Sequence, residues 1–132
     1  MLSIDIVVPT YNRPDDIKKF VDEILSQSYD KFNVFIIDDH GEADLSWLLN
    51  YNSKIHYTRL SKNQGQASAR NIGIKKGLGD IVVSLDDDAW FYKDIEALKK
   101  VANYFMQPEK PGCVMFDIIE PDKKWLSEIR GL

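Results

Sequence analysis

The sequence predicts an α/β fold built on a doubly wound, mostly parallel sheet. Two observations predict it. Short β-branched runs alternate along the chain with segments of helical periodicity, which is the order that strands and crossover helices produce. Several of these runs end abruptly in acidic residues, at the edge where open α/β sheets bind ligands. The 132 residues suffice for one domain with a hydrophobic core but are few for two.

The first two strands and the helix between them follow from local patterns. Residues 4–8 predict a strand that we expect Pro9 to end. Pro14 suits the first turn of a helix. The apolar positions after it recur with the spacing of an amphipathic helix, at Ile17, Phe20, Val21, Ile24 and Leu25. Residues 34–37 then predict a second strand, which leads directly into Asp38 and Asp39.

The middle of the chain predicts two helices and two further strands. Leu45, Leu48 and Leu49 indicate a short helix, and residues 55–60 a more polar strand at the sheet edge. The small side chains of residues 63–77 favour a helix packed close to its neighbours, with Gly77 as its stop. The apolar residues within 81–85 predict a strand buried on both faces, because such runs are typical of parallel sheets covered on both sides.

The C-terminal part predicts one more helix, a strand and a short tail helix. We expect Asp94 to cap a helix whose apolar face is formed by Ile95, Leu98, Val101, Ala102 and Phe105. Residues 113–119 predict a fifth strand, and residues 121–132 one short helix. Because no repeat or linker interrupts the chain, residues 1–132 are expected to form a single domain.

Composition narrows the class of partner and the compartment. The net charge of −4 favours neither nucleic acid nor an anionic membrane surface. The only cysteine, Cys113, cannot form an internal disulfide, which favours a reducing compartment. The first residues lack the basic and apolar regions of a signal peptide, and no apolar segment has the length of a membrane span. We therefore expect a soluble, cytoplasmic domain.

Right-handed crossovers would bring the ends of the first, second and fourth strands to one rim of the sheet. The polar residues expected there are Thr10, Tyr11, Arg13, Asp38, Asp39, Asp86, Asp87 and Asp88. Three adjacent carboxylates repel one another unless a cation or several donors neutralise them. Mg²⁺ or Mn²⁺ is the expected ion, because it binds through few carboxylates and completes its shell with water and diphosphate oxygens. No Cys/His set has the spacing of a zinc site.

Each of these features also has a simpler interpretation. Residues 9–14 could form only a strand-to-helix turn, instead of a loop in which Tyr11 stacks on a base. Asp38 and Asp39 could cap a helix, instead of accepting hydrogen bonds from a base or ribose. Arg70 could make a weak surface ion pair, instead of binding phosphate or carboxylate. The aspartate triplet could be a loop acid run that caps the following helix.

Taken together, the segments VPTYNRP, IIDDHG and NQGQASARNIGIKKGLGDIVVSLDDDA resemble the nucleotide-sugar-binding half of family 2 glycosyltransferases. The resemblance implies the GT-A fold, whose nucleotide-binding half has a Rossmann-like sheet. It also implies transfer of a sugar from a nucleotide diphosphate, commonly UDP, to an acceptor hydroxyl with inversion. The acceptor would be a carbohydrate or a lipid-linked molecule.

The resemblance further implies roles for single residues. Thr10 and Tyr11 would hold the base and ribose, and Asp39 would bond the uracil. Arg70 would reach the base or the diphosphate. In a DXD motif, Asp86 would lie nearer the ribose and Asp88 would hold the metal. The complete set of residues expected to bind donor or metal is Pro9, Thr10, Tyr11, Arg13, Asp38, Asp39, Asn63, Gly65, Arg70, Asp86, Asp87 and Asp88.

The sequence also departs from the family pattern. Ala89 stands where many members carry a further aspartate, and His40 where glycine or serine is common. The catalytic base of the family is an Asp or Glu in the second half of the fold, together with the acceptor site. We expect that half to be absent from residues 1–132, so no catalytic residue is named.

Two other functions fit parts of the pattern. One is a non-catalytic nucleotide-sugar-binding module that completes its site with a partner chain or in a homo-oligomer. The other is a receiver-like phosphoacceptor domain, which also uses acids at strand ends with magnesium. The receiver domain ranks low, because it needs an acid pair after the first strand, where this chain has Pro9 and Thr10.

Overall fold

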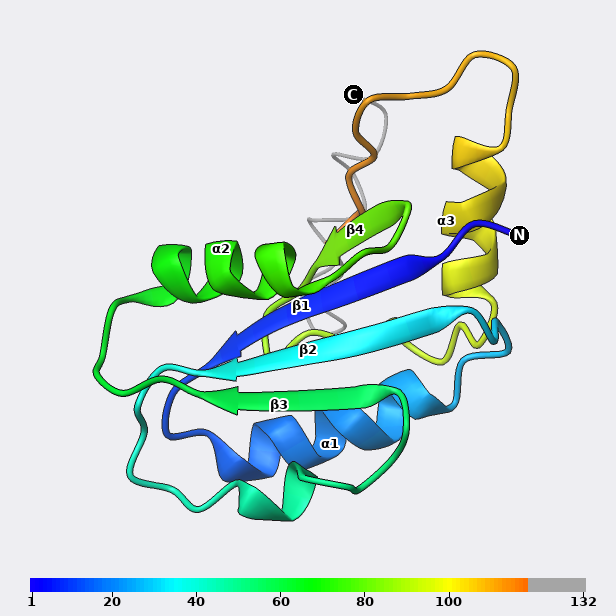
Figure 1. The fold of residues 1–132 in the computed structure, drawn as a ribbon. Helices are drawn as coiled ribbons and strands as arrows, with labels where there is room; N and C mark the ends of the chain where they lie inside the picture. The colour runs from blue at the N-terminus through cyan, green and yellow to red at the C-terminus, as the bar shows by residue number, and fades with distance from the viewer. Residues whose placement is uncertain (119–132) are drawn as a thin grey trace.

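A computed structural model describes residues 1–118 of the chain (Figure 1). Within these residues, four parallel strands form one sheet in the order β3-β2-β1-β4. The strands are β1 (Ile4–Thr10), β2 (Phe32–Asp38), β3 (Ile55–Arg59) and β4 (Ile81–Ser84). The helices are α1 (Pro14–Leu25), the 3₁₀-helix η1 (Ser46–Leu48), α2 (Gln66–Lys76) and α3 (Ala97–Phe105). The predicted α/β class and parallel sheet are confirmed.

Helices cover both faces of the sheet, with α1 and α2 on opposite sides (Figure 1). The larger core lies between the sheet and the helices α1 and α3. It holds Ile17, Phe20, Val21 and Ile24 of α1, as their periodicity predicts. A smaller core lies beneath α2 and includes Ala69. The edge position predicted for the polar third strand is also confirmed, because β3 pairs only with β2 within residues 1–118.

The register of the sheet decides which residues meet at its carboxyl edge. Thr10 at the end of β1 pairs with Asp38 at the end of β2. β4 ends earlier, because its last residue, Ser84, pairs with Val7. Leu85 N still donates to Val7 O at 3.1 Å, so the chain after β4 runs on along the end of β1. This stagger places the aspartate triplet beside Thr10.

The prediction that Pro9 ends the first strand is wrong, because β1 continues to Thr10. In a parallel strand the N–H and C=O of one residue point to the same neighbour. Thr10 O accepts from Asp39 N on the β2 side, whereas Val7 O accepts on the β4 side. Pro9 therefore faces the β4 side, beyond the last residue of that strand. Its missing N–H costs the sheet no hydrogen bond, which is the condition under which a strand tolerates proline.

The prediction that the fourth strand is buried on both faces is also wrong. Ile81 and Val83 are buried in the larger core, but Val82 is 45% exposed. Val82 lies on the face that α2 covers, and α2 packs against β1 and β2. The helix thus leaves this side of β4 open within residues 1–118.

The helix predicted over residues 63–77 is shorter at its start and ends where expected. It begins at Gln66, after Gly65, which has a φ of +87°. Gly77 follows its last residue, but its φ of −84° is not the left-handed conformation of a typical glycine stop. Gly77 is required here by space, because a Cβ would overlap Asp5 Oδ2 and lie 2.7 Å from Asp5 Cγ.

Three local predictions near the other helices are wrong. Leu49 lies outside η1 and is exposed. Asp94 is not the cap of α3, because the helix begins at Ala97 and Asp94 Oδ1 instead accepts a hydrogen bond from Glu96 N at 3.0 Å. Ile95 was expected on the apolar face of this helix. It lies before the first residue of α3 and is exposed.

The predicted fifth strand does not form over residues 113–118. Within residues 1–118 this run pairs with no strand of the sheet, and the apolar side chains of Met115 and Ile118 are exposed. Cys113 is exposed as well. Residue 119 and the short helix predicted for residues 121–132 lie outside the described residues. Among residues 1–118, none of the helices combines the length and apolar character that crossing a membrane requires.

Candidate functional site

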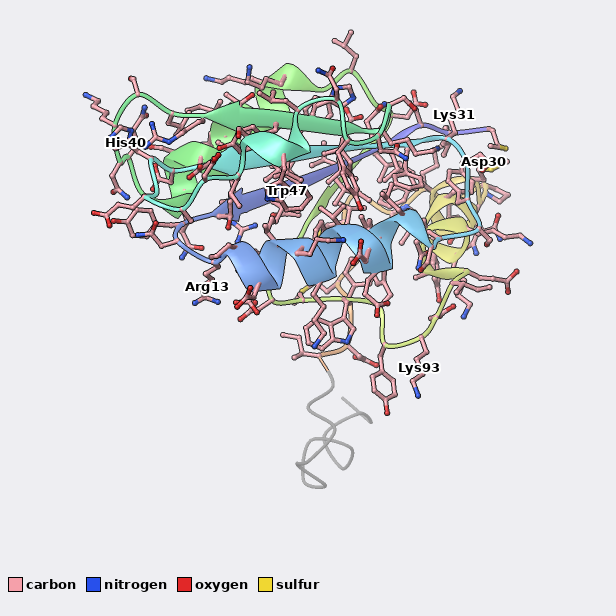
Figure 2. The ribbon with its side chains drawn as sticks, turned by 90° about the horizontal axis from the view of Figure 1, so that it is seen from below. Arg13, Asp30, Lys31, His40, Trp47 and Lys93 are labelled. Atoms are coloured by element: carbon pink, nitrogen blue, oxygen red, sulfur yellow. The ribbon has the colours of Figure 1, made fainter. Side chains whose placement is uncertain are left out.

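The predicted site residues gather at the carboxyl edge of the sheet. Figure 2 shows Arg13 at the start of α1 and His40 after β2 at one end of the molecule, with Asp30 and Lys31 at the opposite end. Four loops meet at this edge, formed by residues 11–13, 39–45, 60–65 and 85–89. The rim expected from right-handed crossovers is therefore present.

The three aspartates after β4 do not point in the same direction. The side chain of Asp87 is 9% exposed, whereas those of Asp86 and Asp88 are 63% and 55% exposed. Thr10 Oγ1 donates a buried hydrogen bond of 2.9 Å to Asp87 Oδ2. The middle carboxylate therefore anchors the loop to the end of β1, and the two outer carboxylates face solvent.

Arg13 neutralises one side of the triplet. Its Nη1 lies 3.2 Å from Asp88 Oδ2, 3.5 Å from Asp87 Oδ1 and 3.8 Å from Asp16 Oδ2. Burial raises the pKa of Asp87, and the Thr10 hydrogen bond and the Arg13 charge oppose that rise. The nearby carboxylates, Asp87 first, raise the pKa of Arg13 in turn. The repulsion expected within the triplet is thus relieved on this side by a cation of the chain.

Arg70 neutralises the other side and also holds the end of β4. Its Nη2 donates to Asp86 Oδ1, and its Nη1 donates to Ser84 Oγ at 2.8 Å and to Leu85 O at 3.0 Å. Gln66 Oε1, one turn earlier on α2, accepts from Nη2 at 3.4 Å. The arginine predicted to bind donor therefore also fixes the strand end from which the triplet starts.

The chemistry of the rim fits a small divalent cation. Asp86 and Asp88 offer exposed carboxylate oxygens, and these are the hard ligands that Mg²⁺ and Mn²⁺ prefer. Within residues 1–118, no group of three or more His, Cys, Asp or Glu side chains is arranged to hold a metal ion. Magnesium sites need no such cage, because one or two carboxylates suffice when substrate phosphates supply the other ligands.

Asp39 joins the loop after β2 to the loop that precedes α2. It is 4% exposed, and its carboxylate accepts the N–H groups of Gln64 at 2.7 Å and of Gly65 at 2.8 Å. Asn63 Nδ2 donates to the Asp39 carbonyl at 3.2 Å. Two carboxylate oxygens carry about four lone pairs, so Asp39 keeps capacity for a further donor.

Asp38 is a buried charge that the fold itself balances. Its Oδ1 accepts Gly41 N at 2.9 Å and its Oδ2 accepts Tyr57 OH at 2.7 Å, with Arg59 Nε at 3.9 Å. Sequence reasoning did not single out Tyr57. The sequence gives little indication of this contact. It depends on the sheet register, in which Tyr57 pairs with Ile36 of β2. The role expected for Asp38 in donor binding stays a prediction.

Tyr57→Phe is expected to lower the free energy of unfolding by about 1–2 kcal/mol, because the buried Asp38 carboxylate loses a donor. Burial, and then the contact with Asp38, raises the pKa of Tyr57 above its ordinary value of 10.0. Above that pH the unfolded chain releases the proton and the folded protein keeps it, so wild-type stability falls as the pH rises. Because Tyr57→Phe lacks this proton, its free energy of unfolding should fall less than that of wild type over the same rise in pH.

Urea unfolding between about pH 8 and about pH 11 measures both effects. Tyr29→Phe is the control for the contact with Asp38. The pKa of Tyr29 is also raised, but its hydroxyl donates to Leu2 O at the other end of the sheet. Equal stability of Tyr57→Phe and wild type at both ends of this pH range would contradict the prediction.

Asn12 is a further residue of the site for which the sequence suggested no role. Its Oδ1 accepts Glu42 N at 2.5 Å and Ala43 N at 3.3 Å, which ties the loop after β1 to the loop after β2. Its φ of 52° is left-handed, a conformation that asparagine adopts more readily than most residues. Gly41 packs against it, because a Cβ at Gly41 would lie 2.8 Å from Asn12 Oδ1. Tyr11, next to Asn12, is half exposed.

His40 makes a similar tie between two other loops of the site. Its φ is 65°, and its ring Nδ1 lies 2.9 Å from Leu60 O. Since a carbonyl only accepts, Nδ1 carries the hydrogen in this contact. The histidine that replaces the usual glycine or serine therefore links the loops after β2 and β3.

Comparison with known proteins identifies the family. The family model for Glycosyl transferase family 2 matches residues 5–130. An uncharacterised glycosyltransferase of Rickettsia felis is 37% identical over 93 residues, which cover 69% of this chain and 15% of that protein. The matched segment of the chain therefore spans about one seventh of the length of this relative.

Solved structures share the fold. Staphylococcus aureus TarS (residues 1–349) in complex with UDP-GlcNAc aligns with a TM-score of 0.69 and 25% identity, over 79% of this chain and 32% of that one. The mannosyltransferase PcManGT of Pyrobaculum calidifontis, in complex with GDP-Man and Mn²⁺, aligns with a TM-score of 0.70 and 23% identity, over 81% and 33%. Both are about three times longer than the matched region. Because the family model covers almost every residue, the chain belongs to glycosyl transferase family 2.

Proposed function

We propose that the chain is the donor-binding part of an inverting glycosyltransferase that binds a UDP-sugar through a divalent metal. The sugar would pass to a hydroxyl of a carbohydrate or lipid-linked acceptor. The observation that carries the proposal is the pair of solvent-facing carboxylates, Asp86 and Asp88, beside Thr10 at the carboxyl edge of a parallel sheet. TarS, which is solved with UDP-GlcNAc, supports UDP as the nucleotide.

On the metal side, Asp88 would hold Mg²⁺ or Mn²⁺ and Asp86 would lie toward the ribose. A bound ion supplies positive charge to the diphosphate, on which negative charge accumulates as the sugar leaves. The residues of the chain orient this ligand set. Asp87 holds the loop to Thr10, and Arg70 holds the end of β4, so both carboxylates of the DXD motif start from fixed backbone.

On the base side, Tyr11 would stack on the uracil and Asp39 would accept its N–H. The half-exposed ring of Tyr11 and the spare lone pairs of Asp39 support these roles. Pro9 and Thr10 would line the ribose side, and Asn63 and Gly65 would contact the donor at the start of α2. Asp38 would keep the loop after β2 in shape, because its carboxylate is engaged with Gly41 and Tyr57.

No general base is assigned. A base must lie within hydrogen-bond reach of the acceptor hydroxyl, and family members carry theirs in the second half of the fold. The matched region is about a third of the solved relatives. We place the reaction in the cytoplasm, where the lone Cys113 is kept reduced.

A second candidate is a non-catalytic nucleotide-sugar-binding subunit that completes its site with a partner chain. One observation favours it. Val82 of β4 and Leu78 just before it are 45% and 99% exposed, so apolar surface remains open beside this strand within residues 1–118. Hydrolysis or transfer of a UDP-sugar by the isolated chain would exclude this candidate.

Calorimetric titration with UDP, GDP, dTDP and CDP, each with Mn²⁺, tests the proposed function. UDP is expected to bind in the micromolar range, and EDTA or Asp88→Ala should abolish the heat of binding. Asp80→Ala is the matched control, because this exposed aspartate lies at the opposite end of β4 and accepts from Ser3 N at 2.8 Å. UDP binding that is absent, or that persists in EDTA, would overturn the proposal.

A further inference from the structure

We propose that Arg13 is an exchangeable counter-ion of the acidic cluster formed by Asp86, Asp87 and Asp88. It neutralises Asp88 while the site is empty of metal, leaves Asp88 when a divalent cation binds there, and then holds the diphosphate. This inference rests on the proposed function, because it concerns how the same site takes up metal and donor.

The first argument is that the two arginines of the cluster are held differently. Arg70 is 23% exposed and donates to the backbone carbonyl of Leu85 and the hydroxyl of Ser84 as well as to Asp86. Arg13 is 50% exposed, and its ion pairs are with the carboxylates of Asp16, Asp87 and Asp88 at 3.2 to 3.8 Å. Arg70 is therefore part of the framework, whereas Arg13 can move when the charge around it changes.

The second argument is that Arg13 competes for the oxygen that the metal needs. Its Nη1 contacts Asp88 Oδ2, the carboxylate assigned to the metal. A divalent cation on that oxygen would lie within a few ångströms of the guanidinium, and like charges at such distances repel strongly. Metal binding to the protein alone must therefore displace Arg13 from Asp88.

The third argument is that Arg13 keeps an anchor after this displacement. Asp87 Oδ1 is 3.5 Å from its Nη1, and Asp87 is buried and fixed by Thr10. The backbone of Arg13 is fixed as well, because it is the N-cap residue of α1 and precedes Pro14. A guanidinium held at Asp87 remains beside the metal-bound diphosphate, which it can bind bidentately.

The exchange predicts effects of opposite sign on two ligands. Without nucleotide, the Arg13 charge opposes the metal, so its removal should tighten Mn²⁺ binding. With nucleotide, the same charge stabilises the diphosphate, so its removal should weaken UDP binding. An arginine with only a structural role would weaken both.

The experiment compares Arg13→Gln with wild type in two titrations. Mn²⁺ binding to the protein alone is followed by the electron paramagnetic resonance of free Mn²⁺, and UDP binding at saturating Mn²⁺ by calorimetry. Arg13→Gln is expected to bind Mn²⁺ about tenfold more tightly and UDP about tenfold more weakly. Arg13→Lys, which keeps the charge, should stay near wild type for Mn²⁺.

Lys18→Gln is the matched control. It removes one positive charge from the same helix, at a side chain of equal exposure that pairs with Asp22 instead of the acidic cluster. Both of its dissociation constants should stay within about twofold of wild type. Circular dichroism melting of each variant confirms that the fold is retained.

Unchanged or weaker Mn²⁺ binding by Arg13→Gln, or unchanged UDP binding, would overturn the exchange. The failure of the proposed function has a different signature. If the wild type shows no Mn²⁺-dependent UDP binding, both proposals are overturned together. If it shows such binding while Arg13→Gln matches it in both titrations, only the role of Arg13 is lost.

Discussion

Asp39→Ala is expected to abolish Mn²⁺-dependent UDP binding and to lower the free energy of unfolding by about 2–4 kcal/mol. The carboxylate is 4% exposed and accepts two backbone N–H groups, those of Gln64 and Gly65. Alanine removes the charged acceptor of both N–H groups, and hydrogen bonds to a charged acceptor are the costly ones to lose. The loop that carries Gly65 into α2 then loses its tie to β2, on the side where we propose that the base binds.

Urea unfolding measures the stability loss, and calorimetry with UDP and Mn²⁺ measures the binding. Asp44→Ala is the matched control, because Asp44 also accepts a backbone N–H, from Ser46 at 2.9 Å, but is exposed. It should cost less than about 1 kcal/mol and leave UDP binding intact. An Asp39→Ala variant that binds UDP as tightly as wild type would remove Asp39 from the site.

Gly73→Ala is expected to destabilise the protein by about 1–3 kcal/mol, although alanine is the better helix former. Gly73 is buried where α2 crosses the sheet. An added Cβ would overlap Val7 Cγ1 and lie 3.1 Å from Ile37 Cγ1. The helix must move away from the sheet to admit it, and Arg70, one turn earlier on α2, moves with it. UDP binding should therefore weaken together with stability.

The cause of this loss can be tested with a second substitution. Val7→Ala removes the methyl group that the new Cβ would meet, so the Val7→Ala/Gly73→Ala double variant should be more stable than the sum of the single effects predicts. Asn71→Ala, at an exposed position of the same helix, should be neutral or slightly stabilising. Strict additivity of the two core substitutions in urea unfolding would contradict close packing as the cause.

Most of the fold follows from local sequence patterns. The helical spacing of Ile17, Phe20, Val21 and Ile24 correctly predicts the buried face of α1. The polar composition of residues 55–60 correctly predicts an edge strand. These patterns are reliable because hydrophobic periodicity records which face of an element is buried, whatever covers that face.

Two of the wrong predictions fall where a distant neighbour decides the outcome. Pro9 remains in β1 because β4 ends before it can require the missing N–H. Val82 is exposed because α2 lies over β1 and β2 instead. The residues next to Pro9 and Val82 in the sequence predict neither outcome. Both depend on how strands far apart in the sequence are aligned.

By itself, the sequence determined the order of the elements from β1 to α3 and the acidic residues at two strand ends, because turn residues and periodicity act over a few positions. It also identified the family through these segments. Only the tertiary structure decided what each carboxylate does. Thr10 and Asp87 are 77 residues apart, and the pairing of Ser84 with Val7 brings them into contact. That register brings the turn after β4 to the end of β1, where Thr10 holds Asp87 inward and Asp88 faces solvent with Arg13.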